Sequence, residues 1–171
     1  DFVADDGKLT AGKPAQAIED RIAQVTQEAY DNGDYIFVAM DRHDEGDTFH
    51  PETKLFPPHN IAGTSGRELY GKLSGVYDNI KDDHRVFWMD KRHYSAFSGT
   101  DLDIRLRERR VTTVVLTGVL TDICVLHTAI DAYNLGYDIE VVESATASLT
   151  PEAHDFAIGH FKNVLGATIV E

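Results

Sequence analysis

The chain has 171 residues, of which 42% are hydrophobic and 26% charged, and its net charge is −13. These values predict a globular chain, and the acidic balance argues against nucleic acid as a partner, because phosphate binding needs a basic surface. The sequence contains no run of about 18 apolar residues, so a membrane span is not expected. The chain has one cysteine, which excludes an intramolecular disulfide and favours a reducing, cytoplasmic setting.

Residues 14–32 are predicted to be a helix, because apolar residues recur at helical spacing and Asn32-Gly33 supplies a stop. An apolar strand is predicted for residues 35–40. Residues 41–66 are rich in Asp, His, Pro and Gly, which indicates a long functional loop. Further along, helices are predicted for residues 121–134 and 151–165, and strands for residues 86–89, 111–119, 139–142 and 167–170.

The alternation of strands and helices predicts a single α/β domain over residues 1–171, with three α/β/α layers and a mainly parallel sheet. Ligands of such sheets bind outside the carboxyl ends of the strands. Three segments with reactive side chains follow predicted strands, at residues 41–43, 90–91 and 118–124. We therefore expect these segments to converge at one edge of the sheet.

Cys124 lies where a predicted strand passes into a helix, with Thr121 or Asp122 as a possible helix cap. The positive end of the helix would favour the thiolate, and backbone N–H groups there could bind an oxyanion. The alternative is a buried cysteine that acts only as a small apolar side chain. Lys91 could lower the pKa of a nearby thiol, or it could be a surface lysine paired with Asp90.

A second group of side chains has the character of metal ligands. Asp41 and His43 are two residues apart, so on an extended backbone both point to the same face. Glu52 and His59 follow in the loop, and His50 is the nearest competing ligand. Imidazoles with carboxylates suit Zn²⁺, Mn²⁺ or Fe²⁺. The alternative is a chance cluster of loop histidines and solvated acids.

Four motifs in order resemble the nicotinamidase/pyrazinamidase group of the isochorismatase-like cysteine hydrolases. They are Asp41-x-His43, Phe-Pro-Pro-His-x-x-x-Gly-Thr over residues 56–64, Lys91, and Gly-x-x-Thr-Asp-x-Cys over residues 118–124. The resemblance covers nearly the whole chain. It is closest to streptococcal-type nicotinamidases, through the stretch at residues 85–99.

The resemblance implies that Cys124 is the nucleophile and Lys91 the second member of a catalytic triad. The third member, an aspartate that ends the first strand, is expected four residues before Asp1-Phe2, so that strand lies upstream of Asp1 and Asp1 is not the triad residue. A C-terminal tail is also expected beyond the last residue. The Val119–Leu120 peptide should be cis, and the N–H groups of Leu120 and Cys124 should form the oxyanion hole.

The resemblance also implies one bound divalent metal ion, with Zn²⁺ expected ahead of Mn²⁺ or Fe²⁺. The implied ligands are Asp41, His43 and His59, with Glu52 as a fourth ligand, directly or through water. Aromatic side chains should line the nicotinamide pocket, and these are Phe2, Phe56 and Tyr94.

The implied activity is hydrolysis of nicotinamide to nicotinic acid and ammonia through a cysteine thioester, in NAD salvage, with pyrazinamide also accepted. The metal would bind the pyridine nitrogen, a water or both. The resemblance further implies a homo-oligomer. Three rival functions stay open: a related hydrolase acting on isochorismate or a carbamoyl-amine, a non-catalytic α/β binding module, and a metallohydrolase whose metal-bound water makes the primary attack.

Overall fold

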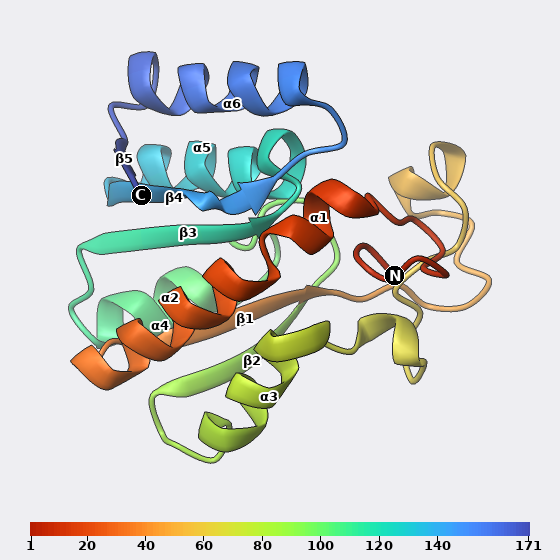
Figure 1. Ribbon diagram of the computed structural model, residues 1–171, viewed down its shortest axis with the longest axis horizontal. Helices are drawn as coiled ribbons and strands as arrows, with labels where there is room; N and C mark the ends of the chain where they lie inside the picture. The colour runs from red at the N-terminus through yellow and green to blue at the C-terminus, as the bar shows by residue number, and fades with distance from the viewer. The chain divides into compact units, whose positions relative to one another are not determined.

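The computed structural model describes residues 1–171 and divides into two compact units, Asp1–Arg92 and His93–Glu171. Each unit contains a sheet with only parallel strand pairings together with helices, so the predicted α/β class is confirmed (Figure 1). The single domain predicted over residues 1–171 stays a prediction. None of the helices combines the length and the apolar character that a membrane crossing needs.

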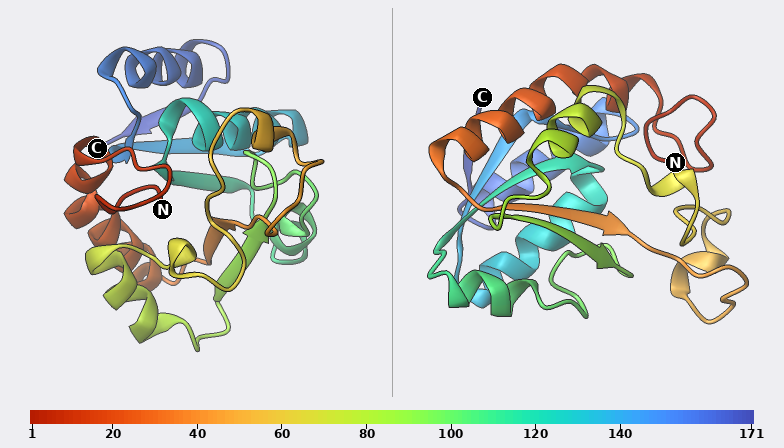
Figure 2. Two further views of the ribbon diagram at one scale, coloured as in Figure 1. Left: turned by 90° about the vertical axis from the view of Figure 1, so that its right-hand side faces the viewer. Right: turned by 90° about the horizontal axis from the view of Figure 1, so that it is seen from below.

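The first unit has a two-stranded sheet in which β1 and β2 run side by side (Figure 2, right). The two strands pair in register from Ile36 opposite Val86 to Asp41 opposite Lys91. Helix α2 packs on α3 and on β1. The elements in chain order are α1 (Lys13–Ala17), α2 (Glu19–Asn32), β1 (Ile36–Asp41), the 3-10 helices η1 (Pro51–Lys54) and η2 (Ser65–Arg67), α3 (Gly71–Ile80) and β2 (Val86–Lys91).

The helix predicted for residues 14–32 is in fact two helices, which separate at Ile18. Its predicted end is confirmed, because Gly33 has the left-handed conformation, with φ of 92°, and its N–H bonds the carbonyls of Ala29 and Tyr30. Helix α3 was not predicted. Its apolar residues Leu73, Val76, Tyr77 and Ile80 recur at helical spacing, so the signal for this helix was present in the sequence and was missed.

The second unit has a three-stranded parallel sheet with the order β3-β4-β5. Helix α6 packs on β4 and β5, and α5 packs on β4 and α6. The most deeply buried side chains include Phe161 on α6 and Val141 on β4. The elements are α4 (Leu102–Glu108), β3 (Thr113–Val119), the π-helical turn η3 (Thr121–Val125), α5 (Leu126–Leu135), β4 (Asp138–Ala147), α6 (Pro151–Asn163) and β5 (Thr168–Val170).

Strand β4 is longer than the predicted strand at residues 139–142. Its pairing with β3 shifts register, since Leu116 lies opposite Val141 while Gly118 lies opposite Thr146. The extra residues of β4 form a bulge, and the strand then continues to Ala147. Polar residues in the second half of β4 hide this extension from a reading based on apolar runs.

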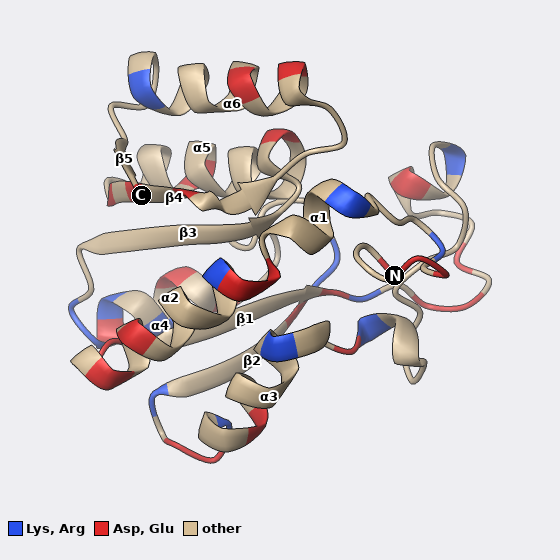
Figure 3. Ribbon diagram, viewed as in Figure 1, with Lys and Arg blue, Asp and Glu red and all other residues tan.

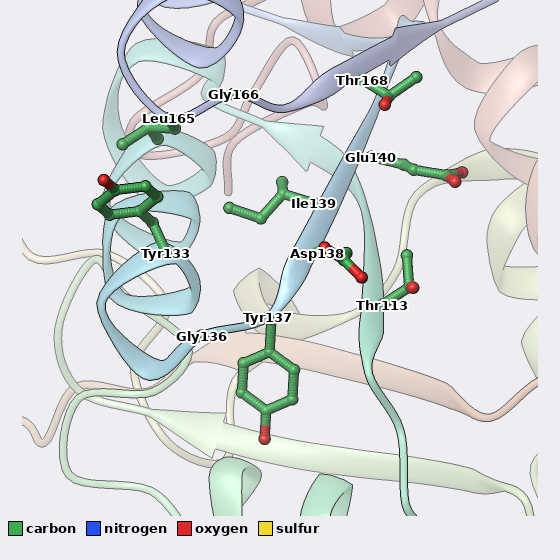
Figure 4. Close-up of a pocket in the computed structure, with 10 residues that line it drawn as sticks. All are labelled: Thr113, Tyr133, Gly136, Tyr137, Asp138, Ile139, Glu140, Leu165, Gly166 and Thr168. Atoms are coloured by element: carbon green, nitrogen blue, oxygen red, sulfur yellow. The ribbon is translucent and has the colours of Figure 1, made fainter.

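A pocket of about 510 Å³ lies in the second unit where the strands begin (Figure 4). Its lining includes Thr113, Asp138 and Thr168, the first residues of β3, β4 and β5. Cys124 follows the opposite end of β3, about 20 Å away for a strand of this length. The pocket therefore contains none of the residues that the sequence predicts for catalysis or binding.

Candidate active site and metal centre

Asp41 and Lys91 end the two strands of the first unit, one on each. They are opposite each other in the register of β1 and β2, and the Lys91 ammonium forms an ion pair with the Asp41 carboxylate. Both side chains are buried. Arg67 also holds this strand end, because its Nε donates to the backbone oxygen of Asp41 at 2.9 Å. Nothing in the sequence around Arg67 indicated this contact.

His43 and His59 are brought together by backbone pairing between their loops. The His43 N–H donates to the carbonyl of Asn60 at 3.1 Å, and the Ala62 N–H donates to the carbonyl of His43 at 2.9 Å. The ring of His59 is oriented by a second contact, in which Nδ1 lies 2.8 Å from the carbonyl of Pro57. Because a carbonyl only accepts, Nδ1 of His59 carries the proton there. The other ring nitrogen, Nε2, is the one that lies near the Glu52 carboxylate.

The side chains of Asp41, His43 and His59 each offer one ligand atom within 4.8 Å of the others. An oxygen of Glu52 is close to both imidazoles, 3.5 Å from Nε2 of His59 and 4.0 Å from Nε2 of His43. Both Nε2 atoms are buried and make no hydrogen bond. Buried polar atoms nearly always have a partner, so two unpartnered nitrogens beside two carboxylates fit a divalent metal ion.

The groups of this cluster shift one another's pKa values. Burial lowers the pKa of His43, and the neighbouring His59 adds to that effect. Burial also acts against a charge on His59, but the Glu52 carboxylate and the Pro57 carbonyl outweigh it and raise the pKa of His59. Burial acts against the Glu52 charge as well, yet the histidines together lower the pKa of Glu52. The pKa shifts of His43 and Glu52 therefore favour the forms that ligate a metal, a neutral imidazole and a charged carboxylate, whereas the shift of His59 favours the protonated imidazole, from which an ion would have to displace the proton.

His50, the competing ligand, has both ring nitrogens engaged by the backbone. Its Nδ1 accepts from the N–H of Glu52 at 3.3 Å, and its Nε2 donates to the carbonyl of Arg92. Its ring packs edge-on against that of His43, with 4.7 Å between centroids. His50 therefore lies beside the cluster without offering it a nitrogen.

Cys124 lies in the turn η3, after the Val119–Leu120 peptide bond, which is cis as the resemblance implied. The carbonyl of Leu120 accepts from the N–H groups of Ile123 and Val125. Cys124 is half-buried, and its carbonyl accepts from the hydroxyl of Thr128 at 2.7 Å. The turn thus has a defined backbone conformation, which presents a thiol where β3 passes into α5.

The predicted capping of this helix by Thr121 or Asp122 is wrong. The cap position is Leu120, without a side-chain cap. The Thr121 hydroxyl pairs instead with Nδ1 of His154 at 2.9 Å, and the Asp122 carboxylate accepts from the hydroxyl of Ser148 at 2.6 Å. These partners come from elements downstream in the chain, which a local reading of residues 118–124 could not find.

The predicted pocket residues lie in both units. In the first unit, the rings of Phe2 and Phe56 lie edge-on to the His59 ring, with centroids 5.5 and 6.2 Å away. In the second, Tyr94 packs against His127 at 5.1 Å. The Asp1 carboxylate accepts from the backbone N–H of Asn60 at 2.8 Å, so it holds the loop after His59. The expected convergence of residues 118–124 with the strand ends of the first unit stays a prediction.

Comparison with known proteins defines the class to which this fold and these motifs belong. The family model described as the Isochorismatase domain matches residues 1–170. The chain therefore belongs to the isochorismatase family.

Within that family, the proteins similar to this chain include nicotinamidases and pyrazinamidases. The crystal structure of a pyrazinamidase/nicotinamidase from Streptococcus mutans is 80% identical, with a TM-score of 0.98 over 99% of this chain and 93% of that one. The Bacillus subtilis isochorismatase family protein PncA, described as uncharacterized, is 54% identical over all of this chain and 93% of its own length. A zinc complex of Pyrococcus horikoshii pyrazinamidase is 25% identical, with a TM-score of 0.85 over 99% and 96% of the two chains.

These similarities confirm two predictions from the sequence. The resemblance to the nicotinamidase/pyrazinamidase group, including a streptococcal member, is confirmed. The α/β class with parallel strands is confirmed over nearly the whole chain. The roles of individual residues stay predictions.

Proposed function

We propose that the protein hydrolyses nicotinamide to nicotinic acid and ammonia through a thioester on Cys124, in the cytoplasm, as a step of NAD salvage, and that it also accepts pyrazinamide. The observation that carries the proposal is the buried cluster of Asp41, His43 and His59, with its two unpartnered imidazole nitrogens. Its occurrence in a chain 80% identical to a pyrazinamidase/nicotinamidase supports this activity over the other activities of the family.

Cys124 would supply the nucleophile. Its proton would pass to the aspartate that the family motif places upstream of Asp1, and the sulfur would attack the carboxamide carbon. The N–H groups of Leu120 and Cys124 would hold the oxygen of the tetrahedral intermediate. The aspartate then returns this proton to the amide nitrogen, the carbon–nitrogen bond breaks, and ammonia leaves as the thioester forms. In the second step the aspartate takes a proton from water, the resulting hydroxide adds to the thioester carbon, the carbon–sulfur bond breaks, and the proton returns to the Cys124 sulfur as nicotinic acid is released. Lys91 would contribute a buried positive charge that favours the thiolate.

The metal set would be Asp41, His43 and His59, with Glu52 as the fourth member, and Zn²⁺ is the ion that we propose first. When bound, such an ion can polarise the ring nitrogen of the substrate or a water molecule. The rings of Phe2 and Phe56, which border His59, would contact the aromatic face of the substrate. Tyr94 would be a third aromatic contact.

The nucleophile is tested by replacing Cys124 with alanine. We expect ammonia release from nicotinamide to fall by at least about 10³-fold, because no other group in the proposed mechanism forms the covalent bond. Rapid acid quench and mass spectrometry of the unaltered protein should detect the nicotinoyl adduct on Cys124. A nearly silent Cys124→Ala substitution would instead support primary attack by a metal-bound water.

The metal is tested by chelation and by replacing His43 with alanine. Thorough chelation should abolish ammonia release, and Zn²⁺, Mn²⁺ or Fe²⁺ should restore it to different degrees. The matched control is His84→Ala, because the side chain of His84 is 88% exposed and lies on the surface. Full activity of protein shown to be metal-free would exclude the metal role, and turnover of a carbamoyl-amine in preference to nicotinamide would exclude the substrate.

A further inference from the structure

The side chain of Arg92, just after β2, holds the loop between β1 and η1 at two carboxylates. Its Nη1 lies 2.6 Å from a carboxylate oxygen of Asp44, and its Nη2 lies 2.6 Å from one of Asp47. The backbone N–H of Phe49 donates to the other Asp47 oxygen at 2.9 Å. Figure 3 shows acidic residues along this loop. Arg92 therefore neutralises two of them and fixes the path that leads to Glu52.

His50 makes the second attachment of the same loop, at the backbone of Arg92. Its side chain is 5% exposed, and Nε2 donates to the Arg92 carbonyl. Because that carbonyl only accepts, Nε2 carries the proton, and Nδ1 is left as the acceptor that caps η1 through the Glu52 N–H. The carbonyl of His50 accepts from the hydroxyl and the N–H of Thr53, which fixes the same turn.

This arrangement connects the residue after β2 to the backbone of Glu52 through the imidazole of His50. Glu52 is buried beside the two metal-facing imidazoles, and its backbone N–H is the one that His50 holds. A carboxylate held in this way needs no further ordering when an ion binds, whereas one on a loose loop would lose conformational entropy at that step. The contact also explains why a histidine lies next to the cluster without joining it.

We propose that His50 and Arg92 are positioning residues, which hold Glu52 as the fourth member of the metal set before an ion binds. His50 is not itself a ligand. The inference rests on the proposed metal role of Asp41, His43 and His59. It goes further because it assigns the tautomer and the function of a histidine that the ligand motif leaves unexplained.

The test measures Zn²⁺ affinity of the full chain by competition with a chromophoric chelator. His50→Phe removes both ring nitrogens and keeps a planar ring, and Glu52→Gln removes the proposed fourth ligand. Each substitution should weaken Zn²⁺ binding about 10- to 100-fold, the usual range for groups that orient a metal ligand. Combined, they should weaken binding no more than Glu52→Gln alone, because His50 acts through Glu52.

Two further variants separate positioning from folding. His50→Asn keeps an acceptor near the position of Nδ1 and should restore most of the Zn²⁺ affinity lost in His50→Phe. Arg92→Lys keeps a positive charge but can hold only one of Asp44 and Asp47 at a time, so it should weaken Zn²⁺ binding less than Arg92→Gln. His84→Asn serves as the surface control. If His50→Phe does not fold, as judged by circular dichroism, His50→Ala replaces it in the cycle, and His50→Asn stays the variant that should restore affinity.

Co²⁺ provides a readout that does not depend on turnover. The visible spectrum of the Co²⁺-loaded protein reports the number and type of ligands. At saturating Co²⁺, His50→Asn should keep the spectrum of the unaltered protein, whereas Glu52→Gln should change it. Additive effects of His50→Phe and Glu52→Gln on Zn²⁺ affinity, or loss of the Co²⁺ spectrum in His50→Asn alone, would overturn the positioning role. Failure of the unaltered chain to bind either ion would overturn the proposed metal function together with this inference.

Discussion

The buried polar atoms without hydrogen-bond partners are confined to one short stretch of the chain. They are Nε2 of His43, Nε2 of His59 and Oδ1 of Asn60. The two histidines could be predicted from the sequence, because their spacing from Asp41 follows a ligand motif. The role of His50 could not, because its tautomer is set by the carbonyl of Arg92, which is distant in sequence. Local sequence therefore predicts the cluster of Asp41, His43 and His59 but not the contacts that His50 makes beside it.

In the turn η3, we expect Thr121→Val to lower the free energy of unfolding by about 1 kcal/mol, the usual net value of one hydrogen bond. The substitution keeps the shape of the fully buried side chain but removes the hydroxyl that pairs with His154. Urea unfolding followed by circular dichroism measures the change. The control is Thr113→Val at an exposed position of β3, which should change stability by less than about 0.5 kcal/mol. Equal effects of the two substitutions would contradict this role of Thr121.

At the scale of elements, the helices and strands with strong apolar patterns were predicted, but several of their limits were not. The strand predicted at residues 111–119 is observed as Thr113–Val119, and the helix predicted at residues 151–165 as Pro151–Asn163. The break at Ile18 was missed because the apolar spacing runs through it, and the bulge of β4 was missed because it is defined by the register with β3. Helix α4 was missed because it has only 7 residues and few apolar positions to repeat.

Helix α6 offers a direct test of which face stabilises the second unit. Phe161 is fully buried, whereas Phe156 on the same helix is 66% exposed. We expect Phe161→Ala to lower the free energy of unfolding by about 3–5 kcal/mol, because it leaves a cavity in the core. Phe156→Ala should cost less than about 0.5 kcal/mol. The comparison is made by urea unfolding, and a larger effect at Phe156 would mean that its face is covered in solution.

The contact between α2 and the turn before β2 predicts a dependence of stability on pH. Hydrogen bonds from the Arg85 guanidinium hold the pKa of Asp83 far below the usual 3.8. The backbone N–H of Arg85 has the next largest effect, and the Tyr30 hydroxyl adds a third hydrogen bond. A carboxyl whose pKa is lowered by folding stabilises the folded state above its unfolded pKa, and the effect is lost as pH falls towards the lowered value.

Asp83→Asn should therefore destabilise the protein at pH 7, and the difference from the unaltered protein should shrink between pH 4 and pH 2. Thermal unfolding across this pH range, on metal-free protein, measures it. The control is Asp34→Asn, at an exposed position, which should show little change at any pH. A difference for Asp83→Asn that is constant over the whole range would show that the carboxylate charge is not the source of the stabilisation.

At the scale of the whole molecule, the predicted single domain can be tested by linkage to metal binding. All proposed ligands lie in the unit Asp1–Arg92. Zn²⁺ that binds only the folded state adds about 2.7 kcal/mol of stability at a free concentration of 100 times its dissociation constant. Calorimetry of a single domain should show one unfolding transition that moves to higher temperature with Zn²⁺. Two transitions, with only one moved by Zn²⁺, would show that the units unfold independently.

The proposed metal ligands all come from one continuous stretch, residues 41–59, whose two ends are joined by the pairing of His43 with Ile61. Contacts between residues close in sequence form early in folding, since closing a short loop loses little chain entropy and takes well under about a microsecond. The turn η3, which contains Cys124, is held instead by Ser148 and His154, far downstream. During synthesis on the ribosome, the ion-binding stretch would therefore be complete while the groups that shape the cysteine turn had yet to emerge.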